Sequence, residues 1–358
     1  MLYFLGTLIE QSFGPARLLT SYAVLISLSL FFGFLITFLL LPKFYKFLPS
    51  DRGREFTLKD NAEAAKGKPT GSGVVFITIF VLTVLLFIPV DWQQSAILVL
   101  TWLCMLTGYL DDRSKNGWGE YRKALLDLII CLAASFALYF FNESVRNGNA
   151  IQFWLPFTSK LFNIPCWLYI LISTVMLWIS INITNCSDGV DGLSSTLALI
   201  ALITMGTIFY FILGHKEISA YLLVPHLNDG ASWGLMVFSL AGVLMGYLWH
   251  NAFPSNVLMG DAGSRPIGFF IGVCVMVSGN PLLILVTSTI FFINGGMGLL
   301  KVFLLRFFKI SIFKNIRFPL HDHFRKVRNW SPTQVLIKFM ILQILITMAL
   351  TGIIFKVR

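Results

Sequence analysis

Five aspartates stand where long apolar runs of this chain end. They are Asp111, Asp112, Asp188, Asp191 and Asp261. A carboxylate beside hydrocarbon is energetically costly, and several carboxylates close together repel one another. A bound cation offsets both effects, and carboxylate oxygens with room for water and phosphate suit magnesium. The pattern therefore predicts a magnesium and phosphate site at the surface of a membrane.

Asp111 and Asp112 close one apolar run, and Lys115 follows them. Neighbouring residues on a helix point about 100° apart, so one carboxylate can face a site while the other binds a neighbouring group. With Lys115, the pair would handle a metal ion or a phosphate. The alternative is a helix end that nearby lysines and arginines neutralise, and two adjacent aspartates alone do not separate these interpretations.

A second polar group lies in segment 182–193, Asn-Ile-Thr-Asn-Cys-Ser-Asp-Gly-Val-Asp-Gly-Leu. Its amides are Asn182 and Asn185, and its carboxylates are Asp188 and Asp191. The two glycines allow a tight turn and a close approach of the backbone to a ligand. An Asx-turn that caps the next helix through Asp191 or Ser194 is the alternative. Four amide and acid groups exceed what a cap needs, so we favour a binding site.

Three further segments carry polar side chains. Asp261 lies in Met-Gly-Asp-Ala-Gly-Ser, where an exposed backbone between glycines suits metal ligation, although an ordinary aspartate in a turn fits too. His321-Asp322-His323 lies in a basic loop that either binds phosphates or is simply solvated. Segment 66–73, Lys-Gly-Lys-Pro-Thr-Gly-Ser-Gly, is similar to a phosphate-binding loop but lacks the Gly-Lys-Ser/Thr order. A basic loop that binds lipid headgroups fits it equally well.

Long apolar runs must position these groups. Apolar residues make up 56% of the chain and charged residues only 12%, about half the charged share of a soluble domain. A membrane-spanning helix needs about 20 apolar residues, and no run alternates strictly as a barrel strand does. We therefore expect an all-α polytopic membrane protein, one domain over residues 1–358. About ten transmembrane helices are predicted, over residues 19–41, 74–90, 96–110, 124–141, 167–183, 193–213, 233–249, 267–277, 282–305 and 335–355.

The distribution of charge predicts the orientation. Most of the 27 lysines and arginines lie in the loops after the first, third and ninth runs. Basic loops face the cytoplasm, so we expect both termini outside and an active site on the cytoplasmic face. The net charge of +10 does not indicate a nucleic-acid partner, because the basic residues form no soluble domain.

Cysteine spacing and the N-terminus give two further expectations. The five cysteines have no paired spacing, which predicts neither disulfides nor a zinc site. The first apolar run is too long for a cleavable signal peptide.

The ninth run is interrupted by Asn294-Gly-Gly-Met-Gly. Glycines at this density could bend the helix and open a lateral groove for a lipid tail. Close helix packing through small residues is the alternative, and we favour it.

Together, Asp111-Asp112, segment 182–193 and Met-Gly-Asp-Ala-Gly-Ser at 259–264 resemble the motifs of the polyprenyl-phosphate N-acetylhexosamine-1-phosphate transferases. Their order and spacing match over almost the whole chain, and segment 66–73 is similar to the Lys-x-Gly-Thr-Pro-Thr-Met-Gly-Gly loop of one branch. That branch transfers phospho-MurNAc-pentapeptide from UDP-MurNAc-pentapeptide to undecaprenyl phosphate, giving lipid I and UMP with Mg²⁺. The resemblance thus implies a multi-pass enzyme of the bacterial inner membrane.

The resemblance also implies roles for individual residues. Asp261 would be the magnesium ligand, and Asp111 and Asp112 the essential acid pair, with Asp111 at the lipid phosphate. The other positions would bind substrate or supply positive charge: Asp188, Asp191 and Asn185 at the uridine diphosphate, Lys115 and Lys123 as basic positions, and Thr70, Asn182, Asn251, His321 and His323 as polar positions.

The chain departs from the branch pattern at three places. His321-Asp322-His323 stands where three consecutive histidines are usual, and Leu258 stands where an aromatic would stack on uracil. Asp127 replaces a usual glutamine four residues after Lys123, and a salt bridge within the helix is the simple interpretation.

The lipid phosphate is largely ionised near neutral pH, because such a second pKa is about 6. We expect a single displacement, although a two-step route through phosphorylated Asp112 or Asp188 stays open. A UDP-GlcNAc:undecaprenyl-phosphate transferase is the nearest alternative function. A transporter is the remote one, because transporters place acids near the middle of the bilayer. The oligomeric state stays open, with a homodimer among the choices.

Overall fold

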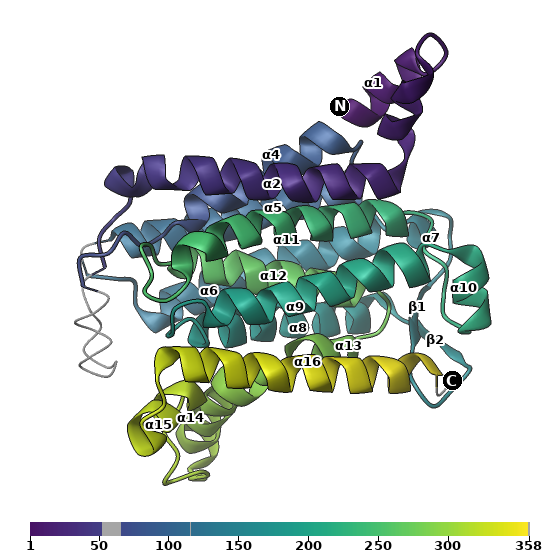
Figure 1. Ribbon diagram of the computed structural model, residues 1–358. Helices are drawn as coiled ribbons and strands as arrows, with labels where there is room; N and C mark the ends of the chain where they lie inside the picture. The colour runs from purple at the N-terminus through teal and green to yellow at the C-terminus, as the bar shows by residue number, and fades with distance from the viewer. Residues whose placement is uncertain (52–65, 115, 357–358) are drawn as a thin grey trace.

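The fold is a bundle of long helices, described by a computed structural model for residues 1–51, 66–114 and 116–356 (Figure 1). Within these residues, eight helices are long and apolar enough to cross a membrane. They comprise α2 (Tyr22–Phe44) with η2 (Tyr45–Phe47), α5 (Trp92–Arg113), α6 (Glu120–Phe140), α8 (Cys166–Cys186), α9 (Leu193–Thr207) with η3 (Ile208–Leu213), α11 (Gly230–Asn251), α13 (Leu283–Phe291) with η4 (Phe292–Gly296) and α14 (Met297–Phe308), and α16 (Pro332–Lys356).

Two shorter helices complete the bundle. α4 (Gly73–Phe87) has 15 residues and α12 (Asp261–Val277) has 17. The short run predicted at 267–277 therefore belongs to a longer helix that begins at Asp261. Together, these elements confirm the expected class, an all-α polytopic membrane protein.

α11 and α12 form the centre of the bundle, and nearly every residue of α12 is buried. Close packing depends on small residues: a Cβ added at Gly242 of α11 would lie 2.2 Å from the carbonyl oxygen of Leu30 in α2. Without a water-driven force between helices in lipid, such close backbone contact supplies much of the attraction.

The segment between α6 and α8 contains a β-hairpin that the sequence did not predict. β1 (Ile151–Trp154) pairs antiparallel with β2 (Leu161–Ile164), and α7 (Glu143–Arg146) precedes them. Trp154 is buried and its indole donates to the carbonyl oxygen of Ser278 at 2.7 Å. The hairpin follows the far end of α6, so it lies opposite the end where α5 and α6 meet. α10 (Lys216–Tyr221) and the C-terminus lie beside it (Figure 1).

The ninth apolar run is bent as well as closely packed. Ser288 leaves the helical conformation, and η4 is a π-helical turn that contains Asn294. A Cβ added at Gly295 would lie 2.8 Å from the carbonyl oxygen of Ile183, so this turn sits directly on α8. Close packing, the favoured interpretation, is confirmed; the lateral groove stays a prediction. Beyond η4, α14 diverges from the bundle toward α15 (Leu320–Arg328) (Figure 1).

The N-terminal residues precede the bundle. α1 (Leu2–Ile9) and η1 (Gly14–Thr20) pack on each other ahead of α2.

Candidate active site

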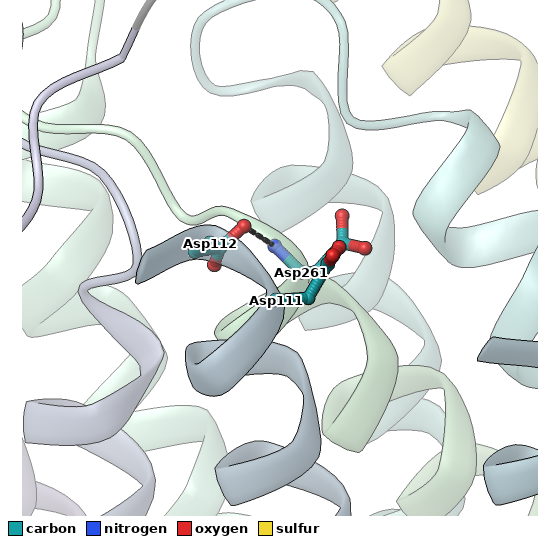
Figure 2. A group of neighbouring side chains, drawn as sticks. All are labelled: Asp111, Asp112 and Asp261. Carbon is teal, nitrogen blue, oxygen red and sulfur yellow. Dashed lines mark hydrogen bonds between the residues drawn. The ribbon is translucent and has the colours of Figure 1, made fainter. Parts of the chain in front are cut away.

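Asp112 caps the N-terminus of α12. Its Oδ1 accepts a hydrogen bond from the backbone N–H of Asp261 at 3.1 Å (Figure 2). Its Oδ2 accepts one from the backbone N–H of Ala262 at 3.0 Å. The first N–H groups of a helix have no partner within the helix, and a carboxylate there also interacts favourably with the helix dipole. The last turn of α5 is thereby joined to the first turn of α12.

Asp111, the other member of the pair, faces Lys123 and Asp261. The Lys123 ammonium lies between them: it forms an ion pair with Asp111 Oδ2 and lies 3.0 Å from Asp261 Oδ2. The other oxygen of Asp111 accepts the backbone N–H of Trp118 at 2.6 Å. Both carboxylates are buried, with 5% of Asp111 and 2% of Asp261 exposed. The two adjacent aspartates therefore bind different partners, as the 100° between neighbouring helical residues allows.

Two glycines bring these helix ends together. A Cβ added at Gly108 of α5 would lie 2.4 Å from the carbonyl oxygen of Asp261, and one added at Gly73 of α4 would lie 2.1 Å from that of Ala262. Neither glycine was predicted to be a packing position, although Gly73 ends segment 66–73. Gly108 stands three residues before Asp111, and that spacing on one helix face was the available signal.

The cluster fits a divalent cation of the magnesium type. Asp111, Asp112 and Asp261 each offer an oxygen, and these atoms lie within 4.8 Å of one another. All donors are carboxylate oxygens, the ligands that magnesium prefers. Two of the three carboxylates, Asp111 and Asp261, share the single Lys123 ammonium. Asp261, predicted as the metal ligand, and both members of the acid pair are thus brought to one place.

A second group links segment 182–193 to the loop after α11. Asp191 Oδ2 accepts the backbone N–H of Ser255 at 3.0 Å and lies 3.9 Å from the Lys68 ammonium. Asn251 is buried, and its side chain accepts from Gly192 N–H at 2.9 Å and donates to the Val257 carbonyl oxygen at 2.8 Å. Among the described residues no side chain caps the start of α9, so the alternative interpretation, in which Asp191 only caps this helix, is wrong.

Segment 66–72 lies between this group and the aspartate cluster. Leu258 donates its N–H to the Pro69 carbonyl oxygen at 2.8 Å and accepts from the Ser72 hydroxyl at 2.9 Å. Thr70 is buried, and a Cβ added at Gly71 would lie 3.3 Å from Asp112 Oδ2. The backbone of this loop therefore forms part of the wall beside Asp112.

His321 packs against segment 182–193 at Gly189. Its backbone N–H and ring Nδ1 both bond Asn294 Oδ1, at 2.9 and 3.1 Å, which assigns the ring proton to Nδ1. A Cβ added at Gly189 would lie 2.5 Å from its Nε2. Burial, and then the nearby Arg325, lowers the pKa of His321 to about 3, so the ring is neutral.

The neighbours of His321 bind within their own loop. Asp322 Oδ2 lies 3.6 Å from Arg317 Nε, and burial raises the pKa of Asp322 against the effect of that arginine. His323 Nδ1 accepts the backbone N–H of Arg317 at 3.3 Å. The structure therefore does not draw His323 into the aspartate cluster.

Other predicted site residues lie apart or cannot be placed. Asn182 donates to the Trp178 carbonyl oxygen of its own helix at 2.8 Å. The backbone carbonyl oxygen of Asn185, in the last turn of α8, accepts the backbone N–H of Asp188 at 3.1 Å. Lys115 lies outside the described residues. Contacts of these residues with a substrate stay predictions.

The prediction of a salt bridge between Asp127 and Lys123 within α6 is wrong. Lys123 pairs with Asp111 and Asp261, whereas Asp127 pairs with Arg265 of α12. The physical reason is tertiary: α12 presents a carboxylate and a guanidinium one turn apart, and each finds its opposite charge on α6.

Comparison with known proteins places the chain. The family described as glycosyl transferase family 4 matches residues 94–279, which include all three aspartates of the cluster. The chain is 54% identical over 348 residues to the phospho-N-acetylmuramoyl-pentapeptide-transferase of Treponema pallidum (strain Nichols), covering 97% of this chain and 94% of that protein. It is 30% identical over 358 residues to the Campylobacter jejuni (strain RM1221) protein of the same name, covering 96% and 97%. The chain therefore belongs to glycosyl transferase family 4 and, within it, to the phospho-N-acetylmuramoyl-pentapeptide-transferases.

Proposed function

We propose that this chain transfers phospho-MurNAc-pentapeptide from UDP-MurNAc-pentapeptide to undecaprenyl phosphate, releasing UMP and forming lipid I. An oxygen of the lipid phosphate forms a bond to the β-phosphorus, and the bond from that phosphorus to the UMP oxygen breaks. The observation that carries the proposal is the aspartate cluster at the meeting of α5, α6 and α12, in a chain of this family.

Asp261 would hold Mg²⁺, with Asp111 and Asp112 beside it. When bound, the ion would neutralise charge on the pyrophosphate and on the leaving UMP. Phosphoryl transfer depends mainly on positioning and charge stabilisation, so residues that fix these carboxylates matter as much as the carboxylates do.

Lys123 holds its positive charge between Asp111 and Asp261 and would stabilise negative charge on the transferring phosphate. Asp111 would accept any residual proton of the lipid phosphate. Both oxygens of Asp112 accept backbone N–H groups, which favours Asp112 as a positioning group over Asp112 as a nucleophile. This arrangement supports a single displacement over a phosphorylated Asp112.

We assign the uridine diphosphate to the surface formed by segment 182–193, segment 66–72 and the loop after α11. Asp191, Lys68 and Asn251 already connect these three segments. Neutral, buried His321 would act beneath that surface, holding the backbone at Gly189 rather than carrying charge to a phosphate.

We further infer that the aspartate end faces the cytoplasm of a bacterial inner membrane, with both termini outside. The basic loops of the sequence support this orientation. α4 and α12 would then be the two additional crossings that make ten.

The test is UMP release by the purified protein in detergent with undecaprenyl phosphate and Mg²⁺. UDP-MurNAc-pentapeptide and UDP-GlcNAc are supplied separately, and Asp261→Asn, which keeps the backbone bond to Asp112, is the control. Release with the muramoyl substrate alone, lost in the control, is expected. Release with UDP-GlcNAc alone would assign the sister activity. No release with either would favour the transporter, although acids at one end of a bundle argue against it.

A further inference from the structure

A second ion pair joins α6 and α12 one helical turn deeper than the aspartate cluster. Arg265 Nη2 donates to Asp127 Oδ1, and only 1% of Arg265 and 2% of Asp127 are exposed. Arg265 follows Asp261 by four residues, and Asp127 follows Lys123 by four. The charges therefore alternate around a square formed by two turns of each helix.

We propose that Arg265 is a positioning residue for the transfer reaction, because it occupies Asp127 and so leaves Lys123 to Asp111 and Asp261. The proposal rests on the proposed function for its activity readout. It assigns a role to two residues that lie outside the aspartate cluster.

The argument begins with the two partners open to Lys123. Residues four apart on a helix are neighbours, so Asp127 is within reach of the Lys123 side chain. Among the described residues, the cations that act on Asp127 are Arg265 and Lys123. A buried carboxylate without a partner is strongly unfavourable. Without the guanidinium, Asp127 would draw Lys123 one turn deeper, away from the cluster.

Arg265 is suited to hold Asp127. The arginine stays charged at every accessible pH, and a guanidinium forms directed bonds to carboxylates. The other terminal nitrogen of the guanidinium, Nη1, is buried with no hydrogen-bond partner among the described residues. The bond from Nη2 to Asp127 is therefore the main interaction of the Arg265 side chain. The thiols of Cys104 and Cys131 lie close to the pair and offer no competing cation.

The loss of Arg265 has two opposite consequences. The rate of transfer falls, because Lys123 no longer faces the transferring phosphate. A divalent cation binds at least as tightly, because one ammonium leaves the neighbourhood of its ligands. A role in general support of the fold predicts instead that both properties decline together.

The experiment compares the wild type, Arg265→Met and the double variant Asp127→Asn/Arg265→Met. UMP release gives kcat, and Mn²⁺ binding by electron paramagnetic resonance, without substrates, gives Kd. For Arg265→Met we expect kcat to fall about 10- to 100-fold, with a Kd for Mn²⁺ no weaker than that of the wild type. The double variant, in which Lys123 has no rival carboxylate, recovers kcat to within about threefold of the wild type.

Adding Lys123→Met to Arg265→Met tests the route of the effect and should cost little further kcat. Where Arg265→Met does not fold, Arg265→Gln keeps a hydrogen bond to Asp127 without the charge and is expected to behave in the same way.

Equal losses of kcat in the single and double variants, or Mn²⁺ binding that weakens in parallel with kcat, would overturn the proposal. A wild type that binds Mn²⁺ but releases no UMP would count against the proposed function instead. In that case the Mn²⁺ affinities still test the positioning role of Arg265. If Arg265→Met weakens Mn²⁺ binding and the double variant does not restore it, the positioning role is refuted.

Discussion

Replacing Asp112 by asparagine tests the difference in role within the aspartate pair. Asparagine keeps one oxygen for one of the two backbone N–H groups at the start of α12, but its amide nitrogen cannot accept the other. That N–H belongs to a buried helix end, since Asp261 and Ala262 are both buried.

The magnitude follows from these two contacts. A buried donor left without an acceptor costs about 1–3 kcal/mol. Loss of a negative charge at a helix N-terminus adds about 0.3–1 kcal/mol. We therefore expect Asp112→Asn to lower the free energy of unfolding by roughly 1–4 kcal/mol and, through displacement of Asp261, to lower kcat about 10- to 100-fold.

Thiol labelling measures the stability change directly. Cys104, Cys131 and Cys274 are free and buried, so a thiol-reactive dye reports their exposure as the protein unfolds in detergent. The matched control is Asp111→Asn. In that variant Lys123, whose side chain is 29% exposed, keeps Asp261 as its partner, so losing the pair with Asp111 should cost about 1 kcal/mol or less. Its kcat should nevertheless fall further than that of Asp112→Asn, because in the proposed reaction Asp111 would face the lipid phosphate.

An unchanged unfolding midpoint for Asp112→Asn would refute this reasoning, because the backbone bonds would then contribute nothing. A phosphorylated aspartate trapped without lipid acceptor, and lost in Asp112→Asn, would assign the nucleophile role to Asp112 and sink the single displacement.

Three other outcomes are expected. Lys123→Met should reduce kcat while leaving Mn²⁺ binding no weaker, because an ammonium is removed from between Asp111 and Asp261; a weaker Kd in the same resonance measurement would contradict this. His321 has a folded-state pKa of about 3 against 6.5 for the free side chain, so the unfolded state binds its proton first as the pH falls. The stability due to neutral His321 is therefore complete above pH 6.5 and declines as the pH falls toward 3. In His321→Gln, the unfolding midpoint should depend less on pH across that range. A pH dependence identical to that of the wild type would contradict this. Gly108→Ala should separate α5 from α12 and cost about 1–3 kcal/mol, whereas Gly352→Ala, with open space around it, should unfold like the wild type.

Hydrophobicity and the types of polar residue were readable from the sequence. Long apolar runs can satisfy their backbone in lipid only as helices, so the polytopic α class follows from the sequence composition alone. The acids at the ends of these runs pointed to a cation, and three of the five aspartates do meet in one cluster. Each of these conclusions depends on the chemical properties of individual residues and short segments, which do not change with the tertiary structure.

The partners of those residues were decided by tertiary structure. Asp112 binds the backbone of α12, Lys123 crosses to Asp261, and Asp127 crosses to Arg265 instead of to its helical neighbour. A spacing of four residues shows which pair can form within a helix, but the competing charge on another helix is invisible until both are packed. Close approach at Gly108 belongs to the same class, because a glycine shows its purpose only when another backbone lies against it.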